Sequence, residues 1–166
     1  MSKKVAYCAI LIALAMIFSY VEALIPVNFG IPGIKLGVAN IVVVVGLYII
    51  KAREVFVISV IRIILVGILF GNVMSILYSL AGGILSLIVM LLMKKMKGFS
   101  IVGVSIAGGV SHNVGQLAVA IAVVENLKLI AYIPVLLIAG AITGFIIGIL
   151  SSKIVPVMKK EVEKVV

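Results

Sequence analysis

Residues 73–93 read VMSILYSLAGGILSLIVMLLM, an unbroken apolar run without a charged side chain. A helix needs about 20 apolar residues to cross the hydrocarbon core of a membrane, which is about 30 Å thick. Length and composition together therefore predict that this segment is a membrane-spanning helix.

The rest of the chain has the same character. Its 166 residues are 65% hydrophobic and 11% charged, whereas soluble domains carry about 25% charged residues. A turn at Phe70-Gly71-Asn72 separates the third and fourth apolar runs, and the second and third runs are short for a spanning helix. We predict an all-α integral membrane protein with one transmembrane domain over residues 1–166, and six spanning helices or, alternatively, five. The apolar runs cover about 5–25, 36–50, 55–70, 73–93, 100–124 and 131–155.

The basic residues are distributed unequally between the two sides of these predicted spans. Of the 14 lysines and arginines, Lys35 and Lys128 fall on one side and Arg62 lies inside a span. Because cytoplasmic loops are enriched in lysine and arginine, we expect both termini to be cytoplasmic in a multi-pass protein of the cell membrane. This distribution between spans also argues against a nucleic-acid-binding surface. The other basic residues are Lys3, Lys4, Lys51, Arg53, Lys94, Lys95, Lys97, Lys153, Lys159, Lys160 and Lys164.

Small residues recur at every fourth position in the last two runs. Helices in lipid associate by close approach at such residues, so we expect these stripes to make helix contacts inside the protein. The stripes are Gly103, Ala107, Ser111 and Gly115 in the fifth run, and Gly140, Gly144, Gly148 and Ser152 in the sixth.

Polar side chains interrupt the fifth run at SHNVGQL, residues 111–117. His112 and Gln116 share one helix face, with Asn113 beside them. Arg62 lies near the middle of the third run, where an unpaired arginine costs at least about 2.5–3.5 kcal/mol. Ionisable groups at membrane depth indicate a functional site, so these four residues are candidate ligand contacts. The alternative interpretation is structural: Arg62 extends to the membrane surface, and the other three join helices by hydrogen bonds.

The segment EALIPVNFGIPGIKLGVAN, residues 22–40, joins the first two runs. Its prolines and glycines exclude a continuous helix and predict a shaped loop on the outer side. Lys35 and Asn40 would then lie at the rim of an outward-facing cavity. An ordinary interfacial turn is the alternative.

Four motifs carry a resemblance to a known family: IPGIKLGVANI (31–41), RIILVGILFG (62–71), LYSLAGGILSL (77–87) and SHNVGQL (111–117). Over about residues 5–155 the chain resembles the Gx transporter family, whose members are often labelled heptaprenyl diphosphate synthase component I. This family is similar to the substrate-binding S components of energy-coupling factor (ECF) transporters. The resemblance implies six helices, a small-molecule site near the outer face, and a first-helix AxxxA contact with a coupling subunit at Ala9 and Ala13.

Enzyme chemistry finds little support in the composition. The chain has no aspartate, and its five acidic residues are scattered glutamates, whereas trans-prenyltransferases use paired aspartate-rich motifs to hold magnesium. It has no GxxxxGK[ST] phosphate loop, and one histidine and one cysteine cannot form a usual zinc site. We therefore predict a protein that is not an enzyme and uses no metal and no cofactor.

These observations lead to a membrane-embedded substrate-binding subunit for small-molecule uptake. Arg62 and Lys35 would favour an anionic or strongly polarised ligand, and Asn40, His112, Asn113 and Gln116 would supply hydrogen bonds. Because the chain has no ATPase motif, a coupling subunit and ATPases would supply the energy. The alternative is a non-catalytic membrane accessory subunit in prenyl or quinone metabolism, or in a flavin-dependent redox assembly.

Overall fold

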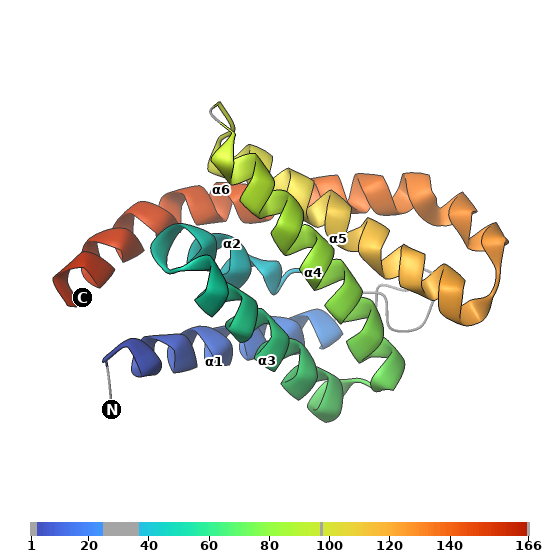
Figure 1. Cartoon of the computed structure of the whole chain (residues 1–166), viewed down its shortest axis with the longest axis horizontal. Helices are drawn as coiled ribbons and strands as arrows, with labels where there is room; N and C mark the ends of the chain where they lie inside the picture. The colour runs from blue at the N-terminus through green and yellow to red at the C-terminus, as the bar shows by residue number, and fades with distance from the viewer. Residues whose placement is uncertain (1–2, 25–36, 97, 166) are drawn as a thin grey trace.

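The computed structural model of the protein describes residues 3–24, 37–96 and 98–165 (Figure 1). These residues form α-helices, one short 3₁₀ helix and no strand, so the prediction of an all-helical chain is confirmed. The elements are α1 (Lys3–Leu24), α2 (Asn40–Ile49), α3 (Ala52–Phe70), α4 (Val73–Lys95), α5 (Ile101–Val124), η1 (Leu127–Tyr132) and α6 (Ile133–Val165).

Three helical stretches in the described part of the chain are long and apolar enough to cross a membrane. The apolar part of α1, residues Ala6–Glu22, and the whole of α2 are shorter. The architecture is therefore compatible with a helical membrane bundle, and six crossings stay a prediction. The three stretches are Val73–Lys95, Ile101–Val124 and Leu127–Lys160.

Two helices do not coincide with the apolar runs. The second run covers about 36–50, whereas α2 begins at Asn40, after Gly37 adopts a left-handed backbone with a φ of 85°. A left-handed residue cannot continue an α-helix, and glycine adopts this conformation at little cost. Towards the C-terminus α6 continues to Val165, past the apolar run that ends at about residue 155, since lysine and glutamate in its last turns are good helix formers.

The predicted turn between the third and fourth runs is confirmed. Helix α3 ends at Phe70, and Asn72 is the N-cap of α4. Its side-chain oxygen accepts a hydrogen bond of 2.8 Å from the backbone N–H of Ser75, which satisfies one of the free amide groups of the first turn.

Helices α5 and α6 pack backbone against backbone. A Cβ atom placed on Gly144 would lie 2.7 Å from Cα of Ile106, and one on Gly148 would lie 2.7 Å from Cα of Val102. Neither position has room for a larger residue unless the helices separate. The glycine stripe of the sixth run therefore makes the helix contact that the sequence predicted.

The fifth-run stripe is displaced from this contact. A Cβ on Gly103 would meet only the side chains of Phe99 and Ser100, at 3.6 Å and 3.7 Å. Gly109 takes its place, because a Cβ there would lie 2.3 Å from the carbonyl oxygen of Gly140. The surface of α5 that contacts α6 therefore includes Gly109, two positions after Ala107 of the predicted stripe.

Helix α5 lies between α4 and α6, and α1 packs along α3 (Figure 1). Helix α2 contacts α1, α3 and α6. The two ends of the chain lie at the same end of the molecule (Figure 1), which agrees with an even number of crossings. The side of the membrane on which they lie stays a prediction.

Candidate functional site

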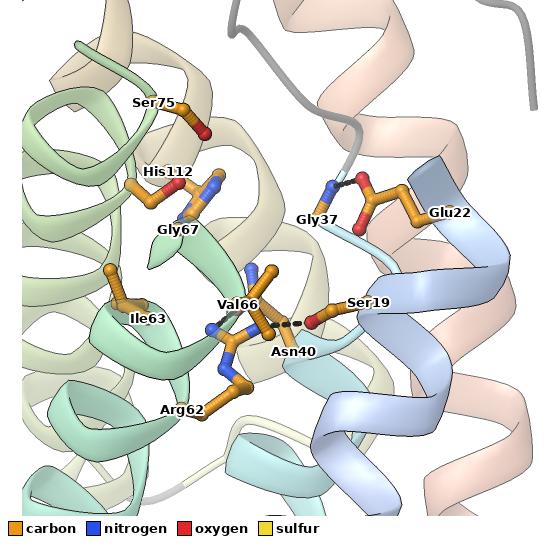
Figure 2. A pocket seen from close by; sticks show the side chains of 11 residues that line it. Ser19, Glu22, Gly37, Asn40, Arg62, Ile63, Val66, Gly67, Ser75 and His112 are labelled. Carbon is orange, nitrogen blue, oxygen red and sulfur yellow. Dashed lines mark hydrogen bonds between the residues drawn. The ribbon is translucent and has the colours of Figure 1, made fainter. Parts of the chain in front are cut away.

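A small cavity lies where the C-terminal halves of α1 and α3 meet the N-terminal ends of α2 and α4 and the middle of α5 (Figure 2). Its volume is about 20 Å³, which is room for about one water molecule. Seven of the eleven residues that line the cavity have polar side chains. The lining residues are Ser19, Glu22, Gly37, Asn40, Arg62, Ile63, Val66, Gly67, Ser75, Ser79 and His112.

Arg62 reaches this cavity from α3 and is only 6% exposed. Its guanidinium donates to the Ser19 hydroxyl at 3.4 Å and to the Asn40 side-chain oxygen at 3.5 Å. Both distances are long for N–H···O hydrogen bonds, which are usually 2.7–3.2 Å. The Nε atom has no hydrogen-bond partner among the described groups. The arginine therefore joins α1, α2 and α3 while retaining hydrogen-bonding capacity.

Glu22 supplies a carboxylate to the same cavity. It is 7% exposed, and its negative charge acts on the guanidinium of Arg62. One carboxylate oxygen accepts a hydrogen bond of 2.5 Å from the backbone N–H of Gly37 (Figure 2). The described lining thus contains one cation and one anion, so the positive charge that Arg62 alone would give the site is compensated.

His112 closes the cavity from α5 and is 3% exposed. Its ring lies against Gly37, where an added Cβ would be 3.3 Å from the histidine Cδ2 and 2.9 Å from the Asn40 amide nitrogen. Gly37 therefore serves two purposes, since it gives the backbone its turn and leaves space for both side chains. The Nδ1 atom of His112 has no partner among the described groups.

Asn113 and Gln116, the other two candidate ligand contacts of SHNVGQL, are buried but do not line this cavity. Asn113 is 1% exposed and donates a hydrogen bond of 2.7 Å to the Leu136 carbonyl of α6. Successive residues on a helix point about 100° apart, which separates Asn113 from His112. Gln116 is fully buried, and a Cβ added to Gly82 would lie 2.9 Å from its Cγ atom. The structure therefore brings His112, Arg62 and Asn40 together, and leaves Asn113 and Gln116 outside the cavity wall.

The remaining predicted residues lie elsewhere. Ala9 and Ala13 are exposed on α1, on the face opposite the buried Leu11 and Ala15. Ala9 lines a separate groove between α1 and α3 of about 510 Å³. Lys35 lies outside the described residues.

Sequence reasoning missed Ser19 and Glu22. A signal was present, because Glu22 is the acidic residue in the apolar part of α1, Ala6–Glu22, and lies three positions after Ser19, on the same helix face. The reasoning that selected Arg62, an ionisable group inside an apolar run, applies equally to Glu22.

The chemistry available in the cavity is hydrogen bonding and charge recognition. Arg62 offers donors, Glu22 offers acceptors, and Asn40 and His112 can do either. Among the described residues no group of three or more His, Cys, Asp or Glu side chains could hold a metal ion. The arrangement suits recognition of a polar molecule.

Fold and site thus define an all-helical protein with membrane-length apolar helices and a polar cavity buried between them. The chain matches the family model described as heptaprenyl diphosphate synthase component I over residues 11–154. Because the match covers most of the chain, the protein belongs to this family. No curated protein and no solved structure gives a match.

Proposed function

We propose that this protein is a membrane-embedded binding subunit for a polar small molecule, and that partner subunits energise uptake of that molecule. The proposal includes a single transmembrane domain with six crossings and both termini in the cytoplasm. The observation that carries it is the convergence of Glu22, Asn40, Arg62 and His112, from four helices, on one buried cavity.

A network that only held helices together would be expected to pair its polar atoms. Buried polar groups in native proteins are nearly always hydrogen-bonded, because an unpaired group loses the full free energy of hydration. Here Arg62 makes two long hydrogen bonds, and the Arg62 Nε and His112 Nδ1 atoms have no partner among the described groups. A polar ligand would provide partners for them. Both amide atoms of Gln116, outside the cavity wall, are also unpaired among the described groups, so it is the cavity beside Arg62 and His112 that favours a ligand there.

The position of the cavity also favours a binding subunit. Its residues come mainly from the C-terminal ends of α1 and α3 and from the N-terminal starts of α2 and α4. If each helix crosses the membrane once, these helix ends lie on the side opposite the two chain termini. With cytoplasmic termini these helix ends would lie in the outer half of the membrane. That location suits a molecule captured from outside.

The charges of the cavity refine the expected ligand. Arg62 and Glu22 oppose each other in the lining, so a ligand with both donor and acceptor groups fits better than a simple anion. A volume of about 20 Å³ also requires helices to move apart when a molecule larger than water binds.

The direct test is native mass spectrometry of the protein purified in mild detergent. We expect a stoichiometric small molecule in the wild type, and at least about tenfold less of it in Arg62→Lys and His112→Ala. The lysine keeps a positive charge opposite Glu22 but loses the forked donor geometry, so the variant should fold. Ser151→Ala is the matched control, because Ser151 is fully buried in α6 and has no described partner for its hydroxyl. The proposal would be contradicted if the wild type and the three variants all retained bulk lipid alone, in equal amounts.

A partner contact on α1 is a second element of the proposal. Ala9 and Ala13 are exposed, so a larger residue there would not disturb the interior. We expect Ala13→Leu to reduce co-purification of a coupling subunit and its ATPases by about tenfold, while Ala118→Leu, an exposed alanine of α5, leaves it unchanged. Equal co-purification with both variants would exclude this face of α1 as the contact.

The family description favours one alternative, a non-catalytic accessory subunit in prenyl or quinone metabolism. The same pull-down separates the two functions. Recovery of a prenyltransferase or a flavoprotein, without ATPases, would favour the accessory role.

A further inference from the structure

The end of the molecule opposite the cavity gathers basic side chains from three separate segments. All of them are exposed, and the acidic residues nearest to them in the sequence are Glu54 in α3 and Glu161 and Glu163 in α6. The Glu54 carboxylate accepts a hydrogen bond of 3.1 Å from the Lys51 backbone N–H. The basic residues are Lys51 and Arg53 at the start of α3, Lys94 and Lys95 at the end of α4, and Lys153, Lys159 and Lys160 in α6.

Lys94 is held in a defined place within this group. Its ammonium donates a hydrogen bond of 2.5 Å to the Leu47 carbonyl at the end of α2, and lies 4.9 Å from the centre of the Tyr48 ring. A lysine that bonds a free carbonyl at a helix C-terminus also interacts favourably with the helix dipole. One of the three N–H donors of the ammonium therefore bonds this carbonyl, and two remain available.

Lys159 of α6 is close enough for its positive charge to act on Lys94. Two cations held near each other repel, and the repulsion is stronger next to an apolar surface than in bulk water. An anion placed between them would remove the repulsion and join α4 to α6.

Exposed apolar side chains lie beside these lysines. Leu92 is 57% exposed and Met96 is 55% exposed at the end of α4, and Ile154 and Val157 are 38% and 63% exposed on α6. With 33 residues, α6 is about 50 Å long at 1.5 Å per residue. It therefore exceeds the membrane core of about 30 Å, and its basic end reaches the headgroup layer. The surface thus offers cations for a phosphate and apolar contacts for acyl chains.

We propose that this basic surface binds an anionic phospholipid, whose phosphate lies between Lys94 and Lys159 and whose chains contact α4 and α6. The site is independent of the cavity and of the proposed uptake function. Loss of the lipid would restore the repulsion between Lys94 and Lys159 and would leave the cavity residues in place.

Native mass spectrometry with defined lipids tests the proposal. The protein in mild detergent is mixed with dioleoyl phosphatidylglycerol or with dioleoyl phosphatidylcholine, and bound lipid is counted. We expect phosphatidylglycerol to be retained at least about fivefold better than phosphatidylcholine. Lys159→Met should lower that retention about fivefold, the effect of one lysine near a charged headgroup.

Matched controls make the outcome decisive. Lys128→Met removes an exposed lysine of η1 at the opposite end and should leave lipid retention unchanged. Lys94 also bonds the C-terminal end of α2, so Lys94→Met can affect folding. The lipid retention of Lys159→Met is therefore the measurement that tests the site. Equal retention of both lipids, or equal effects of Lys159→Met and Lys128→Met, would overturn the proposal.

Two further arms separate the lipid from other sources and other sites. If inorganic phosphate displaces phosphatidylglycerol at equal concentration, the anion site is real but a phospholipid is not its ligand, and the proposal fails. Any small molecule bound in the cavity should persist in Lys159→Met, so failure of the lipid site and failure of the uptake proposal remain distinguishable.

Discussion

Helices α4, α5 and α6 meet backbone to backbone, whereas at the level of the cavity α1, α2 and α3 meet through polar side chains. A Cβ on Gly109 would lie 2.3 Å from the Gly140 carbonyl oxygen, so the backbones of α5 and α6 touch at this point. Arg62, in contrast, spans the distance from α3 to Ser19 and Asn40 with hydrogen bonds of 3.4 Å and 3.5 Å. The first arrangement produces a rigid scaffold, and the second produces a cavity.

This difference indicates where a ligand can enter. Separating α5 from α6 would break many close van der Waals contacts, which are the main attraction between helices in lipid. Moving α1 away from α3 at the cavity would break the long Arg62–Ser19 hydrogen bond, the Tyr20–Phe70 ring contact and the attraction between Glu22 and Arg62. A ligand with both donor and acceptor groups could replace the polar part of these interactions. We therefore expect the α1–α3 half to adjust on binding while the α4–α6 half stays fixed.

The largest effect should come from unbalancing the charges in the α1–α3 half. Arg62→Met leaves the Glu22 carboxylate buried without its cation, and Glu22→Gln leaves Arg62 with neutral partners. Each single change should cost about 3–5 kcal/mol of unfolding free energy. The double variant should recover most of that loss, because neither charge then remains. Unfolding in a denaturing detergent titration measures all three.

Glutamine keeps an oxygen that can accept from the Gly37 N–H, so Glu22→Gln isolates the charge. Arg53→Met is the control for Arg62→Met. It removes an exposed arginine from α3, the helix that also carries Arg62, and should have little effect on the unfolding free energy. Additive losses in the double variant would show that the two charges are not coupled.

A smaller loss is expected from filling the contact in the α4–α6 half. Gly109→Ala places a methyl group against the Gly140 backbone, which cannot move aside as a side chain could. We expect a loss of about 2 kcal/mol from overpacking, even though alanine is the better helix former. Melting temperature in mild detergent is the readout.

Gly103→Ala is the same substitution on the same helix, at a site where the nearest atoms are 3.6 Å away. It should be neutral or stabilising. If Gly109→Ala were equally well tolerated, the backbone contact between α5 and α6 would not limit the packing.

The helical architecture follows from patterns that lie within single segments. An apolar run such as 73–93 has to satisfy its backbone hydrogen bonds internally, and a helix does this without any knowledge of its neighbours. The turn at Gly71 and Asn72 is also local, since Asn72 caps the helix that follows it. Both features could therefore be predicted.

Which residues line the cavity depends on how the helices are rotated relative to each other. The sequence of a single segment does not specify that rotation. Asn113 and His112 are adjacent in sequence, yet one bonds to α6 and the other faces the cavity. Glu22 could have been selected by the same reasoning as Arg62, but its proximity to an arginine 40 positions later is a property of the packed helices. Arg62, His112 and Asn40 were predicted from chemistry, and their grouping required the fold.

Asn113 and His112 allow the roles of structure and binding to be separated on one helix. Asn113→Ala removes the hydrogen bond to the Leu136 carbonyl of α6 and should cost about 1 kcal/mol, the usual size of such bonds between membrane helices. It should not change ligand retention. His112→Ala should show the reverse, with a smaller change in melting temperature and a loss of ligand. Loss of ligand in both variants would mean that the α4–α6 half also moves on binding.

The smallest effect is expected at the turn between the two halves. Asn72→Ala removes the N-cap of α4, whose side chain accepts from the Ser75 N–H at 2.8 Å, and should cost about 0.5–1 kcal/mol. Ser100→Ala removes the corresponding cap of α5, which accepts from the Gly103 N–H at 3.2 Å, and should cost a similar amount. The two variants should differ in the cavity, because Ser75 lines it and no residue of the first turn of α5 does. We therefore expect faster amide hydrogen exchange at Ser75 together with weaker ligand retention in Asn72→Ala, and unchanged retention in Ser100→Ala. Equal ligand retention in both would show that the start of α4 can fray without disturbing the site, which would leave α1, α2 and α3 as the adjustable elements.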